Sequence, residues 1–269
     1  MVATDKLFAG SIPEIYDRFM VPLIFEPYAL DLATRIAAVA PREVLETAAG
    51  TGVLTRALAS RLAPSTRIVA TDLNQAMLDQ AAQRHQGRAV EWRQADALAL
   101  PFADANFDVV ACQFGAMFFP DKVHGYREAR RVLRPAGRFL FNVWDRIEEN
   151  EFADVVTQAL AALFPADPPR FMARTPHGHH DVGRIRQDLA AAGFADIVVD
   201  AVEARSRAPS ARQAAVAYCQ GTPLRTEIEA RDAARLEEAT ERAAAALAVR
   251  FGDGAVDGGI RALVVSAVV

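Results

Sequence analysis

Residues 44–52 read Val-Leu-Glu-Thr-Ala-Ala-Gly-Thr-Gly, and this stretch decides the fold. A short apolar run ends in the acid Glu46, a turn of very small residues follows, and residues 53–62 have a helical composition. A second apolar run, residues 68–70, leads to a second acid, Asp72. In a parallel sheet both acids would lie at the carboxyl ends of adjacent strands, where such sheets bind nucleotide-like ligands. Small residues let a ligand approach the backbone, and an acid at the second strand end can accept hydrogen bonds from ribose hydroxyls.

Strands alternate with helices on either side of this stretch. Alternation of this kind indicates a parallel sheet with helices on both faces, which is an α/β fold. The breakers in Arg134-Pro135-Ala136-Gly137 predict a turn before the last of these strands. The predicted strands are 44–45, 67–71, 89–94, 107–113 and 138–143, and the predicted helices are 53–62, 74–83 and 124–132.

The flanking sequence is more helical and less regular. Residues 11–25 and 28–39 precede the alternating region as helices, the first of them rich in aromatic residues. After Trp144 we expect a loop or lid at 164–180, which is rich in Pro and His. The Ala-rich stretch 211–248 is predicted to be helical, with breaks near Gly221 and Pro223. The other predictions are helices at 152–163 and 182–192, strands at 197–204 and 260–268, and a loop at 252–259.

Composition excludes several classes of function. The chain has 269 residues, of which 52% are hydrophobic, and a net charge of −4, so it carries no basic footprint for nucleic acid or an anionic membrane. Its two cysteines, Cys112 and Cys219, have no metal-ligand spacing, which favours a reducing compartment. The first ten residues lack a secretion signal, and no apolar run approaches the ~18 residues that span a bilayer. We therefore expect a cytoplasmic protein with neither a nucleic-acid nor a membrane partner.

Four motifs in order give the chain a family resemblance. It resembles the class I S-adenosylmethionine (SAM)-dependent methyltransferases, and most of all the small-molecule branch around ubiquinone/menaquinone biosynthesis. The family's acid-x-Gly-x-Gly-x-Gly motif stands here as residues 46–52, with Ala48 in the place of the first glycine. The later motifs are Thr71-Asp72-Leu73-Asn74, then Gln94-Ala95-Asp96-Ala97 with Leu100-Pro101-Phe102 and Asn106-Phe107-Asp108, and finally Leu133-Arg134-Pro135-Ala136-Gly137. The resemblance is strong over about residues 40–145.

The resemblance implies an architecture. The family fold is a Rossmann-like, doubly wound sheet of seven mostly parallel strands, whose last strand is antiparallel. A closing hairpin would be formed by residues 197–204 and 260–268. We expect one domain, with a cofactor-binding core at 40–145 and a helical cap or insertions at 11–40, 145–192 and 205–257.

The resemblance also implies SAM as the cofactor and assigns its contacts. The loop of residues 46–52 would cradle the methionine part, and Asp72 would accept the ribose hydroxyls. Leu73 and Met77 would pack on the adenine, whose amino group would donate to Asp96, with the backbone of Ala97 beside it. Gln113 and Phe114 would lie near the methionine part and the sulfonium, and Tyr16 would reach the cofactor from an N-terminal helix. The predicted cofactor residues are Tyr16, Glu46, Ala48, Ala49, Gly50, Thr51, Gly52, Asp72, Leu73, Met77, Asp96, Ala97, Gln113 and Phe114.

Each of these assignments has a structural alternative. Glu46 could merely cap the turn after it, Leu73 and Met77 could belong to the core, and Asp96 could be a helix N-cap. Tyr16 could be part of an ordinary aromatic stripe. Residues 114–119, Phe-Gly-Ala-Met-Phe-Phe, could line an apolar acceptor pocket or fill the core.

The predicted chemistry is transfer of a methyl group to O, N or C of a small, partly apolar molecule by in-line displacement. Because the methyl donor is already activated, the protein chiefly has to align the reactants, which can supply about 7–11 kcal/mol of the barrier. A general base is needed only for a poorly acidic hydroxyl or a protonated amine, and His124 is a weak candidate for it. His177, His179 and His180 are interpreted as part of a solvated loop, so no metal site is predicted.

Other classes of protein fit less well. A nicotinamide dehydrogenase would need Gly-x-Gly-x-x-Gly, but Gly50-Thr51-Gly52-Val53-Leu54 leads to Thr55. Nucleic-acid methylation is disfavoured by the acidic balance and by Gln113-Phe114-Gly115-Ala116, which is not an Asn/Asp-Pro-Pro-aromatic tetrad. A SAM-binding protein without turnover stays open, as do the acceptor, the methylated atom and the oligomeric state.

Overall fold

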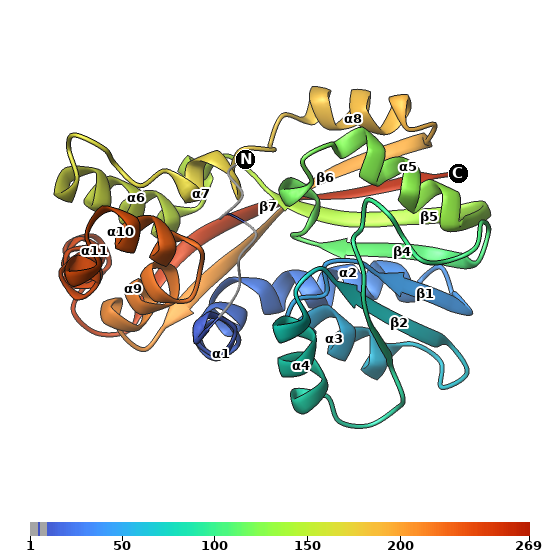
Figure 1. The fold of residues 1–269 in the computed structure, drawn as a ribbon, viewed down its shortest axis with the longest axis horizontal. Coiled ribbons are helices and arrows are strands. Elements are labelled where there is room, and N and C mark those ends of the chain that lie inside the picture. The colour runs from blue at the N-terminus through green and yellow to red at the C-terminus, as the bar shows by residue number, and fades with distance from the viewer. Residues whose placement is uncertain (1–4, 6–9) are drawn as a thin grey trace. The chain divides into compact units, whose positions relative to one another are not determined.

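The computed structural model describes Asp5 and residues 10–269, and these form a seven-stranded sheet in the order β3-β2-β1-β4-β5-β7-β6 (Figure 1). Neighbouring strands from β3 to β5 pair in parallel, and the last strand, β7, is the antiparallel one. The predicted fold class is therefore confirmed. The strands are β1 (Glu43–Glu46), β2 (Arg67–Asp72), β3 (Glu91–Gln94), β4 (Phe107–Gln113), β5 (Leu133–Trp144), β6 (Ala195–Ala208) and β7 (Val256–Val268).

Helices connect and flank these strands, with bounds close to the predicted ones in most cases. Several begin at a side chain that caps the first turn: the carboxylate of Asp121 accepts from the His124 N–H, and Ser210 accepts from the Gln213 N–H. The α-helices are α1 (Ile12–Ile15), α2 (Glu26–Ala37), α3 (Val53–Arg61), α4 (Gln75–Arg84), α5 (Lys122–Val132), α6 (Glu151–Leu163), α7 (Phe171–Arg174), α8 (Val182–Ala191), α9 (Ala211–Gln220), α10 (Leu224–Asp232) and α11 (Leu236–Phe251). The π-helix η2 (Tyr16–Phe25) and the 3₁₀ turns η3 (Ala116–Phe118), η4 (Ile147–Glu149) and η5 (Ala233–Arg235) complete the set.

The chain divides into two compact units. The sheet unit comprises Pro27–Val143, His179–Val202 and Ala262–Val269, and the helical unit comprises Met1–Glu26, Trp144–Gly178 and Glu203–Arg261. Nearly all of the predicted core at 40–145 falls in the sheet unit, together with α8 and all but the first residue of α2, which were predicted as parts of the cap. The organisation as one domain with a cap of those bounds stays a prediction.

The core of the sheet unit covers both faces of its strands. Leu140 of β5 belongs to a buried cluster with Leu32 of α2 and Leu58 of α3. Its neighbours Phe139 and Phe141 point the other way, because side chains alternate along a strand, and both rings contact Tyr126 of α5. Burial on both faces explains why these strands are continuous apolar runs.

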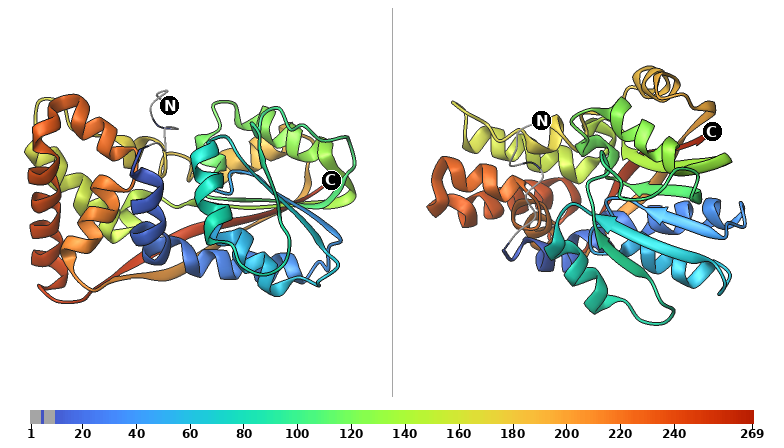
Figure 2. Two further views of the ribbon diagram at one scale, coloured as in Figure 1. Left: turned by 60° about the horizontal axis from the view of Figure 1, so that its bottom comes forward. Right: turned by 45° about the vertical axis from the view of Figure 1, so that its right-hand side comes forward.

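The helical unit is built around α11. This helix packs against α9 and α6, and α9 packs against η2 (Figure 2). Gly221 ends α9, and a Cβ atom there would lie 3.1 Å from Ile15 Cγ2, so the break that was predicted near Gly221 also allows a close contact. Phe152 of α6 and Phe251 of α11 meet edge to face, with ring centroids 4.9 Å apart.

Two sequence predictions differ from the structure. The segment Arg134–Gly137, predicted as a turn, lies inside β5 as an irregularity, where Phe107 pairs with Leu133 and Val109 with Arg138. Four residues of β5 thus oppose the single residue Asp108, and Ala136 takes a left-handed φ of 61°. The strand β7 also begins at Val256, within the predicted loop 252–259.

The predicted loop at 164–180 is the larger correction. It contains α7, and it is not simply solvated, since His177 is only 4% exposed and His179 only 8%. The ring of His177 donates from Nδ1 to the carbonyl oxygen of Asp145 at 2.8 Å, whereas His179 Nε2 lies 3.1 Å from the hydroxyl of Tyr126. Burial lowers the pKa of His179 to about 4, so its ring is neutral at physiological pH. Of the three histidines only His180 is exposed, and composition does not reveal the contacts that bury the other two.

Candidate functional site

Glu46 ends β1 as a buried acid with one oxygen satisfied. Its side chain is 1% exposed, and Oε2 accepts a hydrogen bond from the Thr55 hydroxyl at 2.6 Å. Oε1 is buried without a hydrogen-bond partner. Burial raises the pKa of Glu46 to about 8, and nearby Asp72 adds to the shift, while the Thr55 hydrogen bond and Arg56 oppose it. Sequence reasoning missed Thr55, whose role depends on α3 turning its first residues back over the strand end.

The loop after β1 has an unusual backbone. Ala48, Gly50 and Gly52 all have positive φ, at 52°, 56° and 79°. Such angles suit glycine and are costly for alanine, so Ala48 is held in place by its surroundings. The Ala49 N–H donates to the carbonyl oxygen of Thr71 at 2.9 Å, which ties the loop to the end of β2.

Asp72 ends β2 and organises this loop. Its Oδ2 accepts from the Gly50 N–H at 2.8 Å, and its Oδ1 accepts from the Asn74 N–H at 2.8 Å. The side chain is 7% exposed, and burial raises its pKa despite those hydrogen bonds. Oδ1 also accepts a longer hydrogen bond from Asn74 Nδ2 at 3.4 Å, so the oxygen to which a ligand hydroxyl can still donate is Oδ2. The first and second motifs are thus joined directly, through Gly50.

The residues assigned to the adenine side differ in exposure. Met77 is 3% exposed and lies next to Gly50, whereas Leu73 is 43% exposed. Asp96 is exposed, and its Oδ1 accepts from the Leu98 N–H at 2.9 Å. It therefore caps a turn rather than a helix, and Ala97 follows it half-buried. Their contacts with adenine stay predictions.

The segment after β4 is the third part of the site. Gln113 is 8% exposed, and Phe114 has a left-handed φ of 50° with its ring edge-on to Tyr28, centroids 5.4 Å apart. The Phe114 N–H is shared by two oxygens of Asn142 on β5, the carbonyl at 3.1 Å and Oδ1 at 3.0 Å. Asn142 is fully buried, and sequence reasoning missed it. A polar residue in the apolar run 139–144 was the signal that could have found it.

Tyr16 and His124 lie elsewhere in the chain. Tyr16 belongs to η2 of the helical unit, and its ring centroid is 5.1 Å from that of Phe25. His124 is exposed in the first turn of α5, where its backbone N–H donates to the capping carboxylate of Asp121 at 2.9 Å. Its role as a base stays a prediction. Among the described residues, no three His, Cys, Asp or Glu side chains gather to hold a metal ion.

The residues present fit a nucleotide-type cofactor with a cationic amino-acid part. The orphaned Oε1 of Glu46 calls for a donor, and a bound ammonium group would supply it. A Cβ atom at position 50 would meet no atom closer than 3.7 Å, so space does not require the glycine. Glycine is favoured there by the positive φ, which directs the Gly50 N–H toward Asp72. The topology is that of a Rossmann-like methyltransferase fold, and the binding of the cofactor by the loop between β1 and α3 stays a prediction.

Comparisons with known proteins agree. A family described as "Methyltransferase domain" matches residues 44–137. The ubiquinone/menaquinone biosynthesis C-methyltransferase UbiE of Ectopseudomonas mendocina is 30% identical over 204 residues, which are 71% of this chain and 75% of that protein. The chain therefore belongs to this family of methyltransferases, whose cofactor is SAM.

Two further comparisons, one with a sequence relative and one with a solved structure, show how much of the chain is matched. The demethylmenaquinone methyltransferase of Deinococcus radiodurans is 35% identical over 142 residues, 51% of this chain and 58% of that relative. The chain thus matches little more than half of that relative's length. The solved structure of the YcgJ protein from Bacillus subtilis has a TM-score of 0.57 at 20% identity and covers 90% of this chain, with 98% of its own length matched, which supports the fold.

Proposed function

We propose that this protein is an enzyme that transfers the methyl group of SAM to a small, partly apolar acceptor. The observation that carries the proposal is the arrangement of Glu46, Gly50 and Asp72, in which two buried acids at neighbouring strand ends flank one glycine turn. A quinone-like acceptor is the first to test, because the family relatives are named for demethylmenaquinone and ubiquinone/menaquinone biosynthesis. The methylated atom, O, N or C, is left to the experiment.

Catalysis would rest on positioning. When bound, SAM supplies a methyl group that is already activated by the sulfonium. Ionised Glu46 would hold the ammonium end through Oε1, and Asp72 would hold the ribose while keeping Gly50 in place. Asn142 fixes the left-handed turn at Phe114, and this turn would place Phe114 beside the reacting centre. Such alignment lowers the barrier without requiring a base from the protein.

The segment after β4 supports an apolar acceptor in part. Phe114, Met117 and Phe119 are all buried, which agrees with the alternative that they fill the core, and only Phe118 in this segment is half-buried. Phe118 is therefore the aromatic side chain we assign to the acceptor. Lys122 donates to the carbonyl oxygens of Met117 and Phe119, at 3.0 and 2.7 Å, and so holds this turn against α5.

The position and the hydrogen bond of Thr55 disfavour a nicotinamide cofactor. This residue stands where the dinucleotide fingerprint has its third glycine, which lets helix and strand pack closely. Here the Thr55 side chain is buried and hydrogen-bonded to Glu46, so the position serves the acid. No observation favours a SAM-binding protein without turnover over an enzyme.

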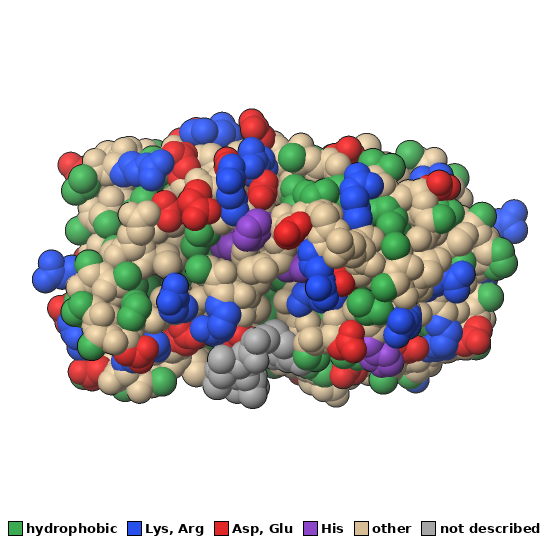
Figure 3. Space-filling view, turned by 90° about the horizontal axis from the view of Figure 1, so that it is seen from above, with side chains coloured by type: hydrophobic (Ala, Val, Ile, Leu, Met, Phe, Trp, Pro, Cys, Tyr) green, Lys and Arg blue, Asp and Glu red, His purple; other side chains and the backbone are tan. Residues whose placement is uncertain are grey.

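The proposal includes a cytoplasmic enzyme without nucleic-acid or membrane partners. Positive and negative side chains are interspersed on the face shown in Figure 3, which supports the absence of a nucleic-acid footprint there. Cys112 and Cys219 are free and buried, which is compatible with a reducing compartment. Within the described residues, no helix is long and apolar enough to cross a membrane.

Calorimetric titration with SAM, S-adenosylhomocysteine and NAD tests the cofactor. We expect binding of both sulfur ligands and none of NAD. Asp72→Ala should weaken SAM binding by about 1.5–3 kcal/mol, the range for a hydrogen bond to a charged group, and its exposed neighbour on α4 supplies the control, Asp79→Asn, with wild-type affinity. Unchanged affinity in folded Asp72→Ala would remove the ribose assignment, and heat with NAD alone would overturn the proposal. Methylated product from a demethylated quinone would then establish the acceptor class.

A further inference from the structure

Gly115 lies just after β4, and its backbone conformation does not require a glycine. Its φ of −104° and ψ of −34° are accessible to any residue. What excludes a side chain is space, since a Cβ atom at this position would overlap the methyl group of Ala48 and lie 2.8 Å from Cys112 Sγ. The glycine therefore exists to admit a neighbour, and that neighbour is the cofactor loop.

Ala48 is the other half of this contact. It stands where the family motif has its first glycine, and it has a φ of 52°, a region that is costly for alanine. Its methyl group lies against the bare backbone of Gly115. The loop thus keeps a glycine-like conformation with an alanine, and the space for the extra methyl group comes from the facing segment.

The facing segment is held firmly enough to act as a template. Phe114, the residue before Gly115, is fixed by the two oxygens of Asn142. The Gly115 carbonyl oxygen accepts from the Phe118 N–H at 2.9 Å, which closes the turn η3. The thiol of Cys112 is fully buried and receives hydrogen bonds from the backbone of Gly115 and Ala116. A side chain at Gly115 would therefore press mainly on Ala48, and to a smaller extent on Cys112.

We propose that Gly115 is a positioning residue for the cofactor, because it fixes the conformation of the SAM-binding loop through the methyl group of Ala48. The two positions act as one steric pair, in which the glycine missing from the loop motif is supplied at 115. This inference rests on the proposed function, since the loop is taken to bind SAM.

A double-mutant cycle tests the pair, with the dissociation constant for S-adenosylhomocysteine as the readout. Gly115→Ala should weaken binding at least about tenfold, which corresponds to about 1.4 kcal/mol, and Ala48→Gly is the second single variant that the cycle needs to measure the coupling between the two positions. The double variant Ala48→Gly/Gly115→Ala should regain most of the lost affinity, with a remainder due to the contact with Cys112. Gly254→Ala is the matched control, because a Cβ there meets nothing within 4 Å.

The melting temperature of each variant is measured in parallel without ligand. The pair predicts that Gly115→Ala lowers it and that Ala48→Gly restores much of the loss. If wild-type protein binds neither SAM nor S-adenosylhomocysteine, the proposed function fails while the melting temperatures still judge the pair. Wild-type affinity in Gly115→Ala, or a double variant no better than Gly115→Ala in both readouts, would overturn the inference.

Discussion

At the scale of single residues, Glu46 makes cofactor binding dependent on pH. Its pKa of about 8 leaves it about 90% protonated at pH 7, and a bound cation would favour the ionised form. We expect SAM binding at pH 7 to release up to about 0.9 proton, seen as a dependence of the binding enthalpy on the buffer's ionisation enthalpy. Glu46→Gln should abolish this release. Proton release that is the same in wild type and Glu46→Gln would place the titrating group elsewhere.

The same residue has a consequence for stability. The folded-state pKa of Glu46 is raised above its unfolded value of 4.5, so the free energy of unfolding is highest below pH 4.5 as far as this group is concerned. That contribution falls as the pH rises and is lost at about pH 8. The reason is that the unfolded state releases the Glu46 proton easily, whereas the folded state must ionise a buried acid. Glu46→Gln should therefore gain stability relative to wild type between pH 5 and 8, with Glu26→Gln at an exposed position as the control.

Asn142 shows how a missed residue can shape a site. Its Oδ1 shares the Phe114 N–H with its own carbonyl oxygen, which stabilises a left-handed turn at a bulky residue. Asn142→Ala should lower the free energy of unfolding by about 0.5–1.5 kcal/mol, the net range for one hydrogen bond, because the Phe114 N–H keeps the backbone carbonyl oxygen of residue 142 as a partner. Urea unfolding would measure this, with Asn106→Ala, a half-buried site in the same unit, as the control. Equal stability of the two variants would contradict the role.

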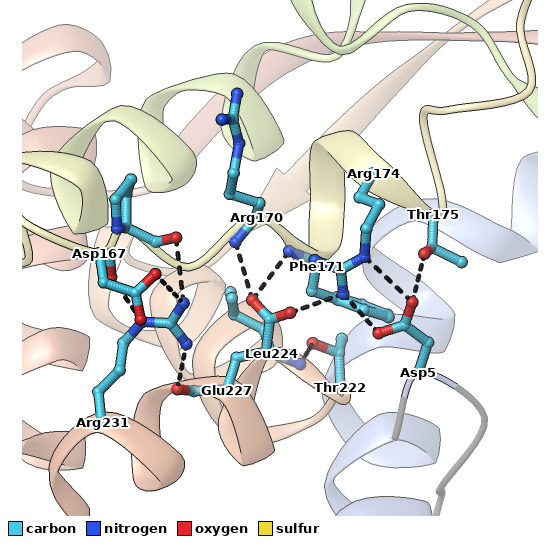
Figure 4. Close-up of polar contacts among 11 residues, drawn as sticks. Asp5, Asp167, Arg170, Phe171, Arg174, Thr175, Thr222, Leu224, Glu227 and Arg231 are labelled. Carbon is cyan, nitrogen blue, oxygen red and sulfur yellow. Dashed lines mark hydrogen bonds and ion pairs between the residues drawn. The ribbon is translucent and has the colours of Figure 1, made fainter. Parts of the chain in front are cut away.

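At the scale of elements, one arginine joins three segments of the helical unit. Arg174 of α7 contacts the carboxylates of Asp5 and Glu227, each at 2.6 Å (Figure 4). Asp5 is 1% exposed and also accepts from the Thr175 hydroxyl at 2.6 Å. The Glu227 carboxylate of α10 accepts hydrogen bonds from the Arg170 and Phe171 N–H groups and so caps the start of α7. The network therefore ties both α10 and Asp5 to a four-residue helix.

Removing Arg174 should be costly, because it breaks the ion pair with the buried Asp5 carboxylate and a second one with Glu227. We expect Arg174→Met to lower the free energy of unfolding by about 3–5 kcal/mol in urea melts followed by circular dichroism. Arg207→Met removes a surface arginine paired with Asp257 and should behave nearly as wild type, since exposed ion pairs contribute little. A loss no larger than that of Arg207→Met would show that the network contributes little.

At the scale of the whole molecule, the net charge predicts that the protein does not bind nucleic acid. A net charge of −4, with both signs interspersed, supplies no excess of cations to displace the counterions of nucleic acid. We expect no gel shift of duplex DNA or of transfer RNA at ~50 mM salt, the condition that most favours weak electrostatic binding. Retention that weakens steeply with added salt would argue against a purely small-molecule acceptor.

The sequence by itself determined the sheet, the acids that end β1 and β2, and the family. Alternating apolar runs and breakers are local, and the motif at 46–52 with Asp72 is read directly, because a strand that ends in an acid before small residues needs no tertiary partner to be recognised. Only the tertiary structure decided who contacts whom. The hydrogen bond of Thr55 to Glu46, the support of Phe114 by Asn142 and the fit of Ala48 over Gly115 each join residues that are distant from one another in the sequence. The burial of His177 and His179 was missed for the same reason, since composition predicts exposure only on average, while burial depends on a partner such as the Asp145 carbonyl or the Tyr126 hydroxyl, far away in the chain.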